Sequence, residues 1–191
     1  HSSLQLPVAV KMLKHDMAMD PSFVEQFRRE GQVVAGLNHQ NIVKVYDVEE
    51  MYRTFFIIME FVEGESLARR LRRDRRPPLK ELVDFLLQIC AGLLHAHEKG
   101  VVHGDVKPGN ILVDAANRVR IVDFGFARSM GSMDTYARGT AHYMSPEQIL
   151  GGPLDERSDI YSLGIMAYEM LAGVRPCPAT DPEDILYWHL E

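Results

Sequence analysis

Three polar side chains carry oxygen atoms that could take part in phosphate chemistry. Asp105 and Asn110 stand at either end of a short polar segment, and Asp123 begins the sequence Asp-Phe-Gly thirteen residues after Asn110. Carboxylate and amide oxygens suit a hard ion such as Mg²⁺. Phosphoryl transfer needs such ligands to fix the ion on the phosphates, and a carboxylate near the attacking hydroxyl. These three residues are therefore the first candidates for a reactive site.

Charged residues near the start of the chain are the next candidates. Lys11 follows Val-Ala-Val in an apolar run, and Glu30 lies nineteen residues further on. A lysine in an apolar strand can be a plain edge charge, but here a glutamate is available to pair with it. Lys107, two residues after Asp105, places a further cation beside the candidate carboxylate.

Hydrophobic patterning predicts the elements that must position these residues. The chain up to residue 63 reads as strand, helix, strand, strand, and from Gly64 onward it is mostly helical. We therefore expect a small mixed lobe at 1–63 and a helical lobe at 64–191, with a ligand cleft where they meet. The predicted strands are 6–13, 42–48, 54–61, 111–113 and 119–122, and the predicted helices are 20–38, 66–73, 79–99, 156–172 and one that begins near 181.

Composition is that of an ordinary globular protein. Hydrophobic residues make up 46% and charged residues 25%, which excludes disorder and a disulfide scaffold. The 21 Lys and Arg against 27 Asp and Glu give a net charge of −6, which argues against a nucleic-acid binder. The chain has no apolar run of membrane-spanning length and no signal-peptide pattern at its start. We expect a cytoplasmic location, no nucleic acid and no membrane contact from this stretch, with any membrane tether lying outside it.

Other features have plain structural interpretations. Six arginines crowd into residues 69–76, which favours a solvated helix face, and a docking patch for an acidic substrate segment is the alternative. Cys90 has no C-x-x-C partner and is expected to be a small buried residue. The inward side of the helix at 79–99 is predicted to consist of Leu82, Phe85, Leu86, Ile89, Leu93 and Leu94.

Ordered motifs along nearly the whole chain resemble those of protein kinases. Lys107 and Thr140 are typical of the serine/threonine class, and the phrases Asn-His-Gln-Asn-Ile-Val and Tyr-Met-Ser-Pro-Glu-Gln are similar to bacterial members. The resemblance implies an α+β, two-lobed protein-kinase-like fold with a small, incomplete β-rich N-terminal lobe and a larger, mainly helical C-terminal lobe without its last helices. The motifs are Val-Ala-Val-Lys at 8–11, Glu30, Ile-Ile-Met-Glu-Phe-Val at 57–62, the segment 101–110, Asp-Phe-Gly from 123, Gly-Thr to Ser-Pro-Glu at 139–147 and Asp-Ile-Tyr-Ser-Leu-Gly at 159–164.

This resemblance implies transfer of the γ-phosphoryl group of ATP to Ser or Thr hydroxyls of protein substrates, with Mg²⁺. Asp105 would be the catalytic base, and Lys107 would stabilise charge that develops on the γ-phosphate. Asn110 and Asp123 would hold the metal. A dimer through the N-terminal lobe is a further hypothesis.

The resemblance also implies a nucleotide site between the lobes. Lys11 would contact the α- and β-phosphates, and its pairing with Glu30 would act as a switch. The remaining nucleotide-binding positions are Ala9 and Leu112, which would sandwich adenine, Met59, which would gate the back of the pocket, and Glu60 and Val62, whose backbones would bond adenine.

Departures from the family's pattern qualify this expectation. Gly104 stands where the family usually has an arginine that receives a phosphate from the activation segment. Phosphorylation of that segment is therefore predicted not to be a strict on-switch, while Thr140 would line the acceptor pocket. None of the ten residues before Lys11 is glycine, although the family has a glycine-rich loop there, so its domain is expected to extend beyond both ends of this stretch. The candidate phosphorylation positions are Ser129, Ser132, Thr135 and Tyr136.

Two alternative functions stay open at this point. His103-Gly104-Asp105 also resembles small-molecule phosphotransferases of the aminoglycoside and choline kinase type, which commonly carry His two residues after the Asp and lack the Gly-Thr to Ser-Pro-Glu segment. A nucleotide-binding pseudokinase scaffold is the second alternative. The presence of Lys11, Asp105, Asn110 and Asp123 argues against it.

Overall fold

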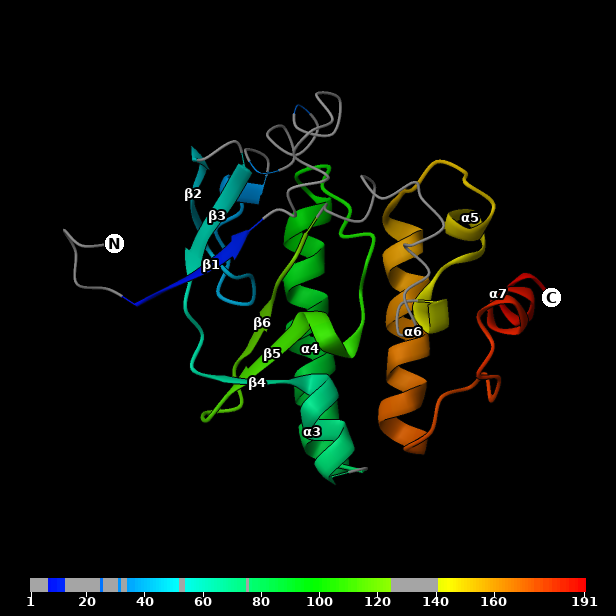
Figure 1. Cartoon of the computed structure of the whole chain (residues 1–191). Helices are drawn as coiled ribbons and strands as arrows, with labels where there is room; N and C mark the ends of the chain where they lie inside the picture. The colour runs from blue at the N-terminus through cyan, green and yellow to red at the C-terminus, as the bar shows by residue number, and fades with distance from the viewer. Residues whose placement is uncertain are drawn as a thin grey trace.

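Two antiparallel sheets and a group of helices make up the described part of the protein (Figure 1). The structure is a computed structural model that describes residues 7–12, 25, 31, 34–51, 54–74, 76–124 and 141–191. The first sheet has the strand order β1-β3-β2, and the second has the order β4-β5-β6. The strands are β1 (Val8–Met12), β2 (Val45–Met51), β3 (Thr54–Glu60), β4 (Gly64–Ser66), β5 (Ile111–Asp114) and β6 (Val119–Ile121).

The helices follow the hydrophobic patterns of the sequence. Helix α4 begins after Pro78, which fixes the entering backbone, and the chain turns at Gly100 with a φ of 70° soon after its end. Asp155 caps the N-terminus of α6, and Gly173 ends that helix in the left-handed region. The helices are α3 (Leu67–Asp74), α4 (Leu79–His97), α5 (Pro146–Ile149), α6 (Glu156–Ala172) and α7 (Pro182–Leu190), with 3₁₀ turns η1 (Pro108–Asn110) and η4 (Ala141–Tyr143).

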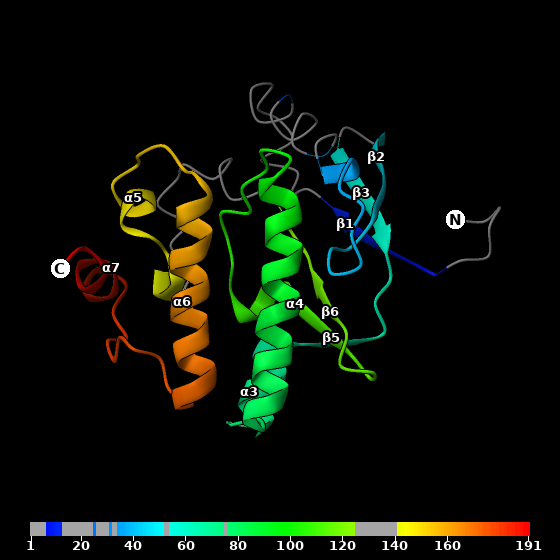
Figure 2. The ribbon, with the colours of Figure 1, turned by 180° about the vertical axis from the view of Figure 1, so that it is seen from behind.

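Helices α4 and α6 run side by side through the middle of the molecule (Figures 1 and 2). The first sheet lies on the other side of α4 from α6, and α7 lies beyond α6 against α5 and η4. None of the described helices is both long enough and apolar enough to cross a membrane.

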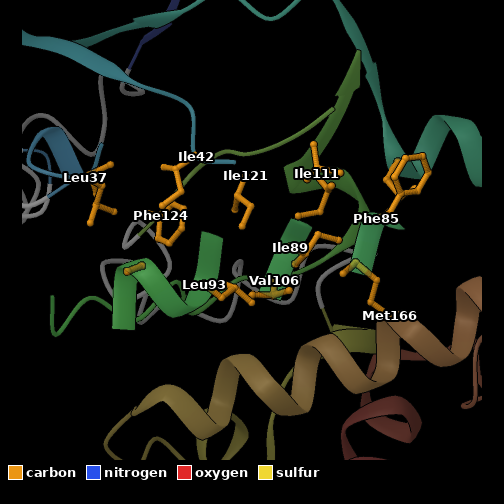
Figure 3. Packing of buried hydrophobic residues seen from close by; sticks show 14 of the residues in the cluster. Leu37, Ile42, Phe85, Ile89, Leu93, Val106, Ile111, Ile121, Phe124 and Met166 are labelled. Atoms are coloured by element: carbon orange, nitrogen blue, oxygen red, sulfur yellow. The ribbon is translucent and has the colours of Figure 1, made fainter. Parts of the chain in front are cut away.

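One continuous core joins the two sheets to the helices (Figure 3). Leu37 and Ile42 come from the first part of the chain, Ile121 and Phe124 from the end of the second sheet, and Met166 from α6. Burying a side chain of this size contributes about 1.5–3 kcal/mol, so the shared core holds the two parts together strongly.

The connection between the sheets explains why β2 begins later than predicted. Ile42 forms an isolated parallel bridge with Ile121, and the Val43 N–H donates to the carbonyl of Ile121 at 2.9 Å. The first residues of the predicted strand 42–48 therefore join the second sheet, and the hairpin with β3 starts only at Val45.

Two predictions about α4 were wrong. Leu94 is 60% exposed and Cys90 is also exposed, although both were expected inside. Successive residues of a helix point about 100° apart, and Leu94 points away from the buried side of α4, which includes Ile89, Leu93 and Ala96. Cys90 likewise lies one position beyond the buried Ile89.

Several arginines of the cluster at residues 69–76 bond to other residues of the protein. Arg70 bonds Glu81 at 3.0 Å, and Arg73 bonds Glu65 at 2.6 Å. Arg76 donates to the carbonyl of Ala172 at the end of α6, at 3.0 and 2.7 Å. These contacts support a helix-surface role for the cluster and leave less positive charge for an acidic docking segment.

Candidate active site

Asp105 is held in place by two neighbouring side chains. Its Oδ2 accepts from Nζ of Lys107 at 2.7 Å and from Nδ2 of Asn110 at 2.8 Å. The same Nδ2 also donates to the backbone carbonyl of Asp105 at 2.8 Å. Asn110 is buried at the end of η1, where the chain enters β5, so the amide has a fixed position. The predicted base, the predicted lysine and one predicted metal ligand thus meet in one place.

The buried His103 ring contacts the backbone of this loop. The residue is fully buried and its ring lies 4.6 Å from the ring of Phe124, measured between centroids. Its Nδ1 accepts from the Asp105 N–H at 3.0 Å, and its Nε2 lies 2.9 Å from the carbonyl of Val122. Because one nitrogen must accept and the other must donate, the ring is the neutral tautomer with its proton on Nε2. The His103 ring therefore holds the backbone of Asp105 in place.

Asp159 anchors the loop at residues 103–110, the candidate catalytic loop, through the backbone. This carboxylate, in the first turn of α6, is completely buried. Its Oδ2 accepts from the His103 N–H at 2.8 Å, and its Oδ1 accepts from the Gly104 N–H at 2.7 Å. His97 at the end of α4 approaches Oδ2 at 2.7 Å. A buried carboxylate needs such partners, and here they hold the two residues just before Asp105.

Sequence reasoning assigned no site role to Asp159. Its position in a segment that resembles a kinase motif was noted, but its partners lie 55 and 56 residues away in the sequence. The available signal was a carboxylate in the first turn of a helix whose following residues are largely apolar.

Lys11 reaches the same site from the first sheet. Its Nζ lies 2.8 Å from Oδ1 of Asp123, which follows β6. Asp123 has a φ of 64°, in the left-handed region that a residue with a side chain seldom adopts. Strain of this kind persists only where the surroundings enforce it, and such positions cluster at functional sites. The two predicted nucleotide-site charges are therefore brought into contact across the junction of the sheets.

The predicted adenine-binding residues come from both sheets and from the segment between them. Ala9 of β1 lies directly opposite Met59 of β3 in the antiparallel register. The Glu60 N–H donates to the carbonyl of Lys44 at 2.9 Å, and the Glu60 carboxylate approaches Arg120 of β6 at 3.7 Å. The partly buried positions are Ala9, Met59, Glu60, Val62 and Leu112.

The segment from Ala141 to Ser145 packs against α6. The Ser162 hydroxyl donates to the carbonyl of Tyr143 at 2.6 Å, and the Tyr143 hydroxyl donates to Glu169. Burial, followed by the Glu169 contact, raises the pKa of Tyr143 well above its usual value. This segment is thus packed onto α6 by hydrogen bonds on both its backbone and its side chains.

The side chain of Glu147 is hydrogen-bonded to the start of α6. It accepts from the Ser158 hydroxyl at the start of α6. Burial favours the neutral carboxyl, but the bond from Ser158 and further bonds, including one from Ser145, outweigh it and lower the pKa of Glu147.

Several predicted residues lie outside the part of the chain that the structure describes. Pairing of Lys11 with Glu30 and the roles of the activation segment therefore stay predictions. These residues are Glu30, Ser129, Ser132, Thr135, Tyr136 and Thr140.

Comparison with known proteins agrees with the geometry. The family model described as the protein kinase domain matches residues 1–190. The chain belongs to the protein kinase family. This confirms the predicted family and its α+β fold.

The similar proteins are bacterial serine/threonine kinases. The chain is 40% identical over 196 aligned positions to serine/threonine-protein kinase PknB of Mycobacterium leprae, which covers 98% of this chain and 32% of that protein. It is 38% identical over 192 positions to serine/threonine-protein kinase PrkC of Bacillus subtilis, covering 98% of this chain and 30% of that protein. The chain spans about a third of the length of these curated relatives.

Proposed function

We propose that this kinase chain transfers the γ-phosphoryl group of ATP to Ser or Thr hydroxyls of protein substrates in a Mg²⁺-dependent reaction. The single observation that supports this most is the convergence of Asp105, Lys107 and Asn110 around one carboxylate oxygen. The names of the relatives favour this function over the aminoglycoside and choline kinase alternative. We further propose a lobe boundary between residues 63 and 64, because the first sheet ends at Glu60 and the second begins at Gly64.

Asp105 is the proposed base. Its carboxylate is oriented by Asn110 and Lys107, and it would accept the proton of the attacking hydroxyl. Lys107, already within reach of this site, would move its charge toward the transferred phosphoryl group as negative charge develops there. Lys11 would bind the α- and β-phosphates and Asp123 would lie beside them.

The side chains present fit Mg²⁺. The Asn110 nitrogen is committed to Asp105, so its carbonyl oxygen is the atom that it can offer to a cation. Asp123 supplies a carboxylate, and Mg²⁺ is usually held by one or two such groups together with phosphates and water. Among the described residues no three His, Cys, Asp or Glu side chains form a metal cluster, which accords with an ion held mainly by the nucleotide. Such an ion neutralises phosphate charge during transfer.

The Asp105→Asn substitution tests this function. We expect transfer of labelled phosphate from ATP to a generic basic protein to fall by about 10³-fold, because the base and its charge are lost. ATP affinity should stay nearly unchanged, because Asp105 contacts the acceptor side. The matched control is Asp84→Asn on the exposed face of α4, which should leave transfer unchanged.

Other outcomes would overturn the proposal. Equal transfer by the Asp105→Asn protein would remove Asp105 as the base. Transfer to an aminoglycoside but not to protein would favour the small-molecule enzyme class. Magnesium-dependent ATP binding without any transfer would favour a scaffold.

A further inference from the structure

Gln148 in α5 connects two segments that are far apart in the sequence. Its Nε2 donates to the carbonyl of Gly104 at 2.6 Å. Its Oε1 accepts from the Ser145 N–H at 2.9 Å and from the Ser145 hydroxyl at 3.2 Å. One amide group therefore links the end of the 141–145 segment to the residue just before Asp105.

Gly104 can be positioned only through its backbone. It has no side chain, it is buried, and its φ of 74° places it in the left-handed region. Asp159 accepts from its N–H at 2.7 Å, and Gln148 donates to its carbonyl. The carbonyl belongs to the same peptide group as the Asp105 N–H, which donates to His103. Gln148 thus fixes the peptide plane that immediately precedes the proposed base.

We propose that Gln148 is a positioning residue that couples the 141–145 segment to Asp105. The inference rests on the proposed kinase function. Because the same amide holds Ser145 and Gly104, displacement of the segment is transmitted to the peptide before Asp105. The link is made of uncharged groups within the chain, so it needs no phosphate to form. It touches neither Lys11 nor Asp123, and it should affect peptide turnover without changing ATP affinity.

The decisive variant is Gln148→Glu in the full chain. Glutamate keeps the size and the acceptor for Ser145, but a carboxylate oxygen faces the Gly104 carbonyl and cannot donate. We expect kcat/KM for a Ser/Thr peptide to fall about tenfold at about pH 8, with the Kd for ATP unchanged. Toward lower pH the new carboxyl binds a proton and regains a donor, because the Gly104 carbonyl that it faces favours its neutral form. The ratio of variant to wild-type activity should then recover to within about threefold.

The ratio of variant to wild-type activity reports on the carboxyl group that Gln148→Glu introduces. Asp105, His103 and Asp159 face this peptide from the catalytic loop and α6, and Glu147 neighbours Gln148 on α5. All four groups are present in both proteins, so the effect of their protonation on activity cancels in the ratio. Gln148→Met, which can neither donate nor accept, should show the same loss without any recovery at low pH.

Gln88 offers a closely matched control. Its Nε2 also donates to a backbone carbonyl, that of Asn117, at 3.0 Å. Its Oε1 also accepts two bonds, from Asn41 and from the Val119 N–H. Gln88→Glu and Gln88→Met make the same chemical changes away from the catalytic loop. They should lower stability without changing the peptide kcat/KM by more than about twofold.

The outcomes separate this proposal from the proposed function. If wild type transfers phosphate and the Gln148 and Gln88 variants behave alike, the coupling role is overturned and the kinase function stands. If wild type transfers none, the kinase function fails. Hydrogen exchange without nucleotide gives a second readout: amides in 103–110 should exchange faster in Gln148→Met than in Gln88→Met. Equal exchange in this loop would also overturn the proposal, even for a variant too unstable for kinetics.

Discussion

The catalytic loop and strand β1 bring charged groups to one site but hold them by different means. Asp105 lies on a loop whose backbone is bonded to the fully buried Asp159, and its carboxylate is bonded by the buried Asn110. Lys11 comes from a strand at the edge of the described sheet, and its side chain is 43% exposed. Water cannot replace the buried bonds, whereas it screens the exposed ion pair.

Because of this difference, the effect of a residue on the stability of the protein need not match its effect on phosphate transfer. Residues that hold the loop contribute to both, because removing a buried acceptor leaves amide groups unsatisfied. The exposed lysine can matter for nucleotide binding while contributing little to the folded state. The bonds around Asp105 are therefore already formed in the absence of substrate, whereas the contact of Lys11 with Asp123 is partly open to water.

Asp159→Ala should have the largest effect on stability. The backbone amides of His103 and Gly104 would lose their acceptor, and His97 would lose its partner. We expect the free energy of unfolding to fall by about 3 kcal/mol, with loss of phosphate transfer because the loop before Asp105 is released. Urea unfolding and a transfer assay measure the two effects.

Asp155→Ala is the control for this change. It removes a carboxylate from the N-cap of the same helix, where the side chain accepts from the Arg157 N–H in an exposed position. Its cost should be about 1 kcal/mol. If Asp159→Ala costs no more than this, buried anchoring of the loop is not what distinguishes the two regions.

His142 should give the next largest effect, and one that depends on pH. Burial lowers the pKa of this imidazole to about 4, with smaller contributions from Arg175 and His189. Within the described part of the chain its buried Nδ1 has no hydrogen-bond partner. The unfolded chain therefore binds this proton at a higher pH than the folded one, and stability is lost as pH falls from about 6.5 toward about 4.

His142→Gln removes this titration. Between about pH 7.5 and about pH 5, wild type should lose about 2 kcal/mol more stability than the variant. Urea unfolding at a series of pH values measures the difference, in which His39 and His189 cancel because both proteins contain them. Parallel curves for the two proteins would show that His142 takes up a proton in the folded state as readily as in the unfolded chain.

The sequence predicted local elements better than the contacts between them. The long helix, the β2–β3 hairpin and the closeness of Asp105 to Lys107 and Asn110 could be predicted because spacing and periodicity act over a few residues. The roles of Asp159 and Gln148 could not, because their partners lie 44 to 56 residues away and only the fold brings them near. The exposure of Leu94 likewise depends on which of two adjacent leucines the core can accept.

Lys11→Met should have the smallest effect on stability and yet a large effect on function. The Lys11 side chain is 43% exposed in its ion pair with Asp123, so we expect the free energy of unfolding to change by less than about 1 kcal/mol. Phosphate transfer should fall by about 10²-fold or more, because the cation at the phosphates is lost. Lys44→Met, at an exposed position just before β2, should change neither quantity. If Lys11→Met destabilises the protein as much as Asp159→Ala, the nucleotide side is anchored as firmly as the catalytic loop. The contrast between the two regions would then fail.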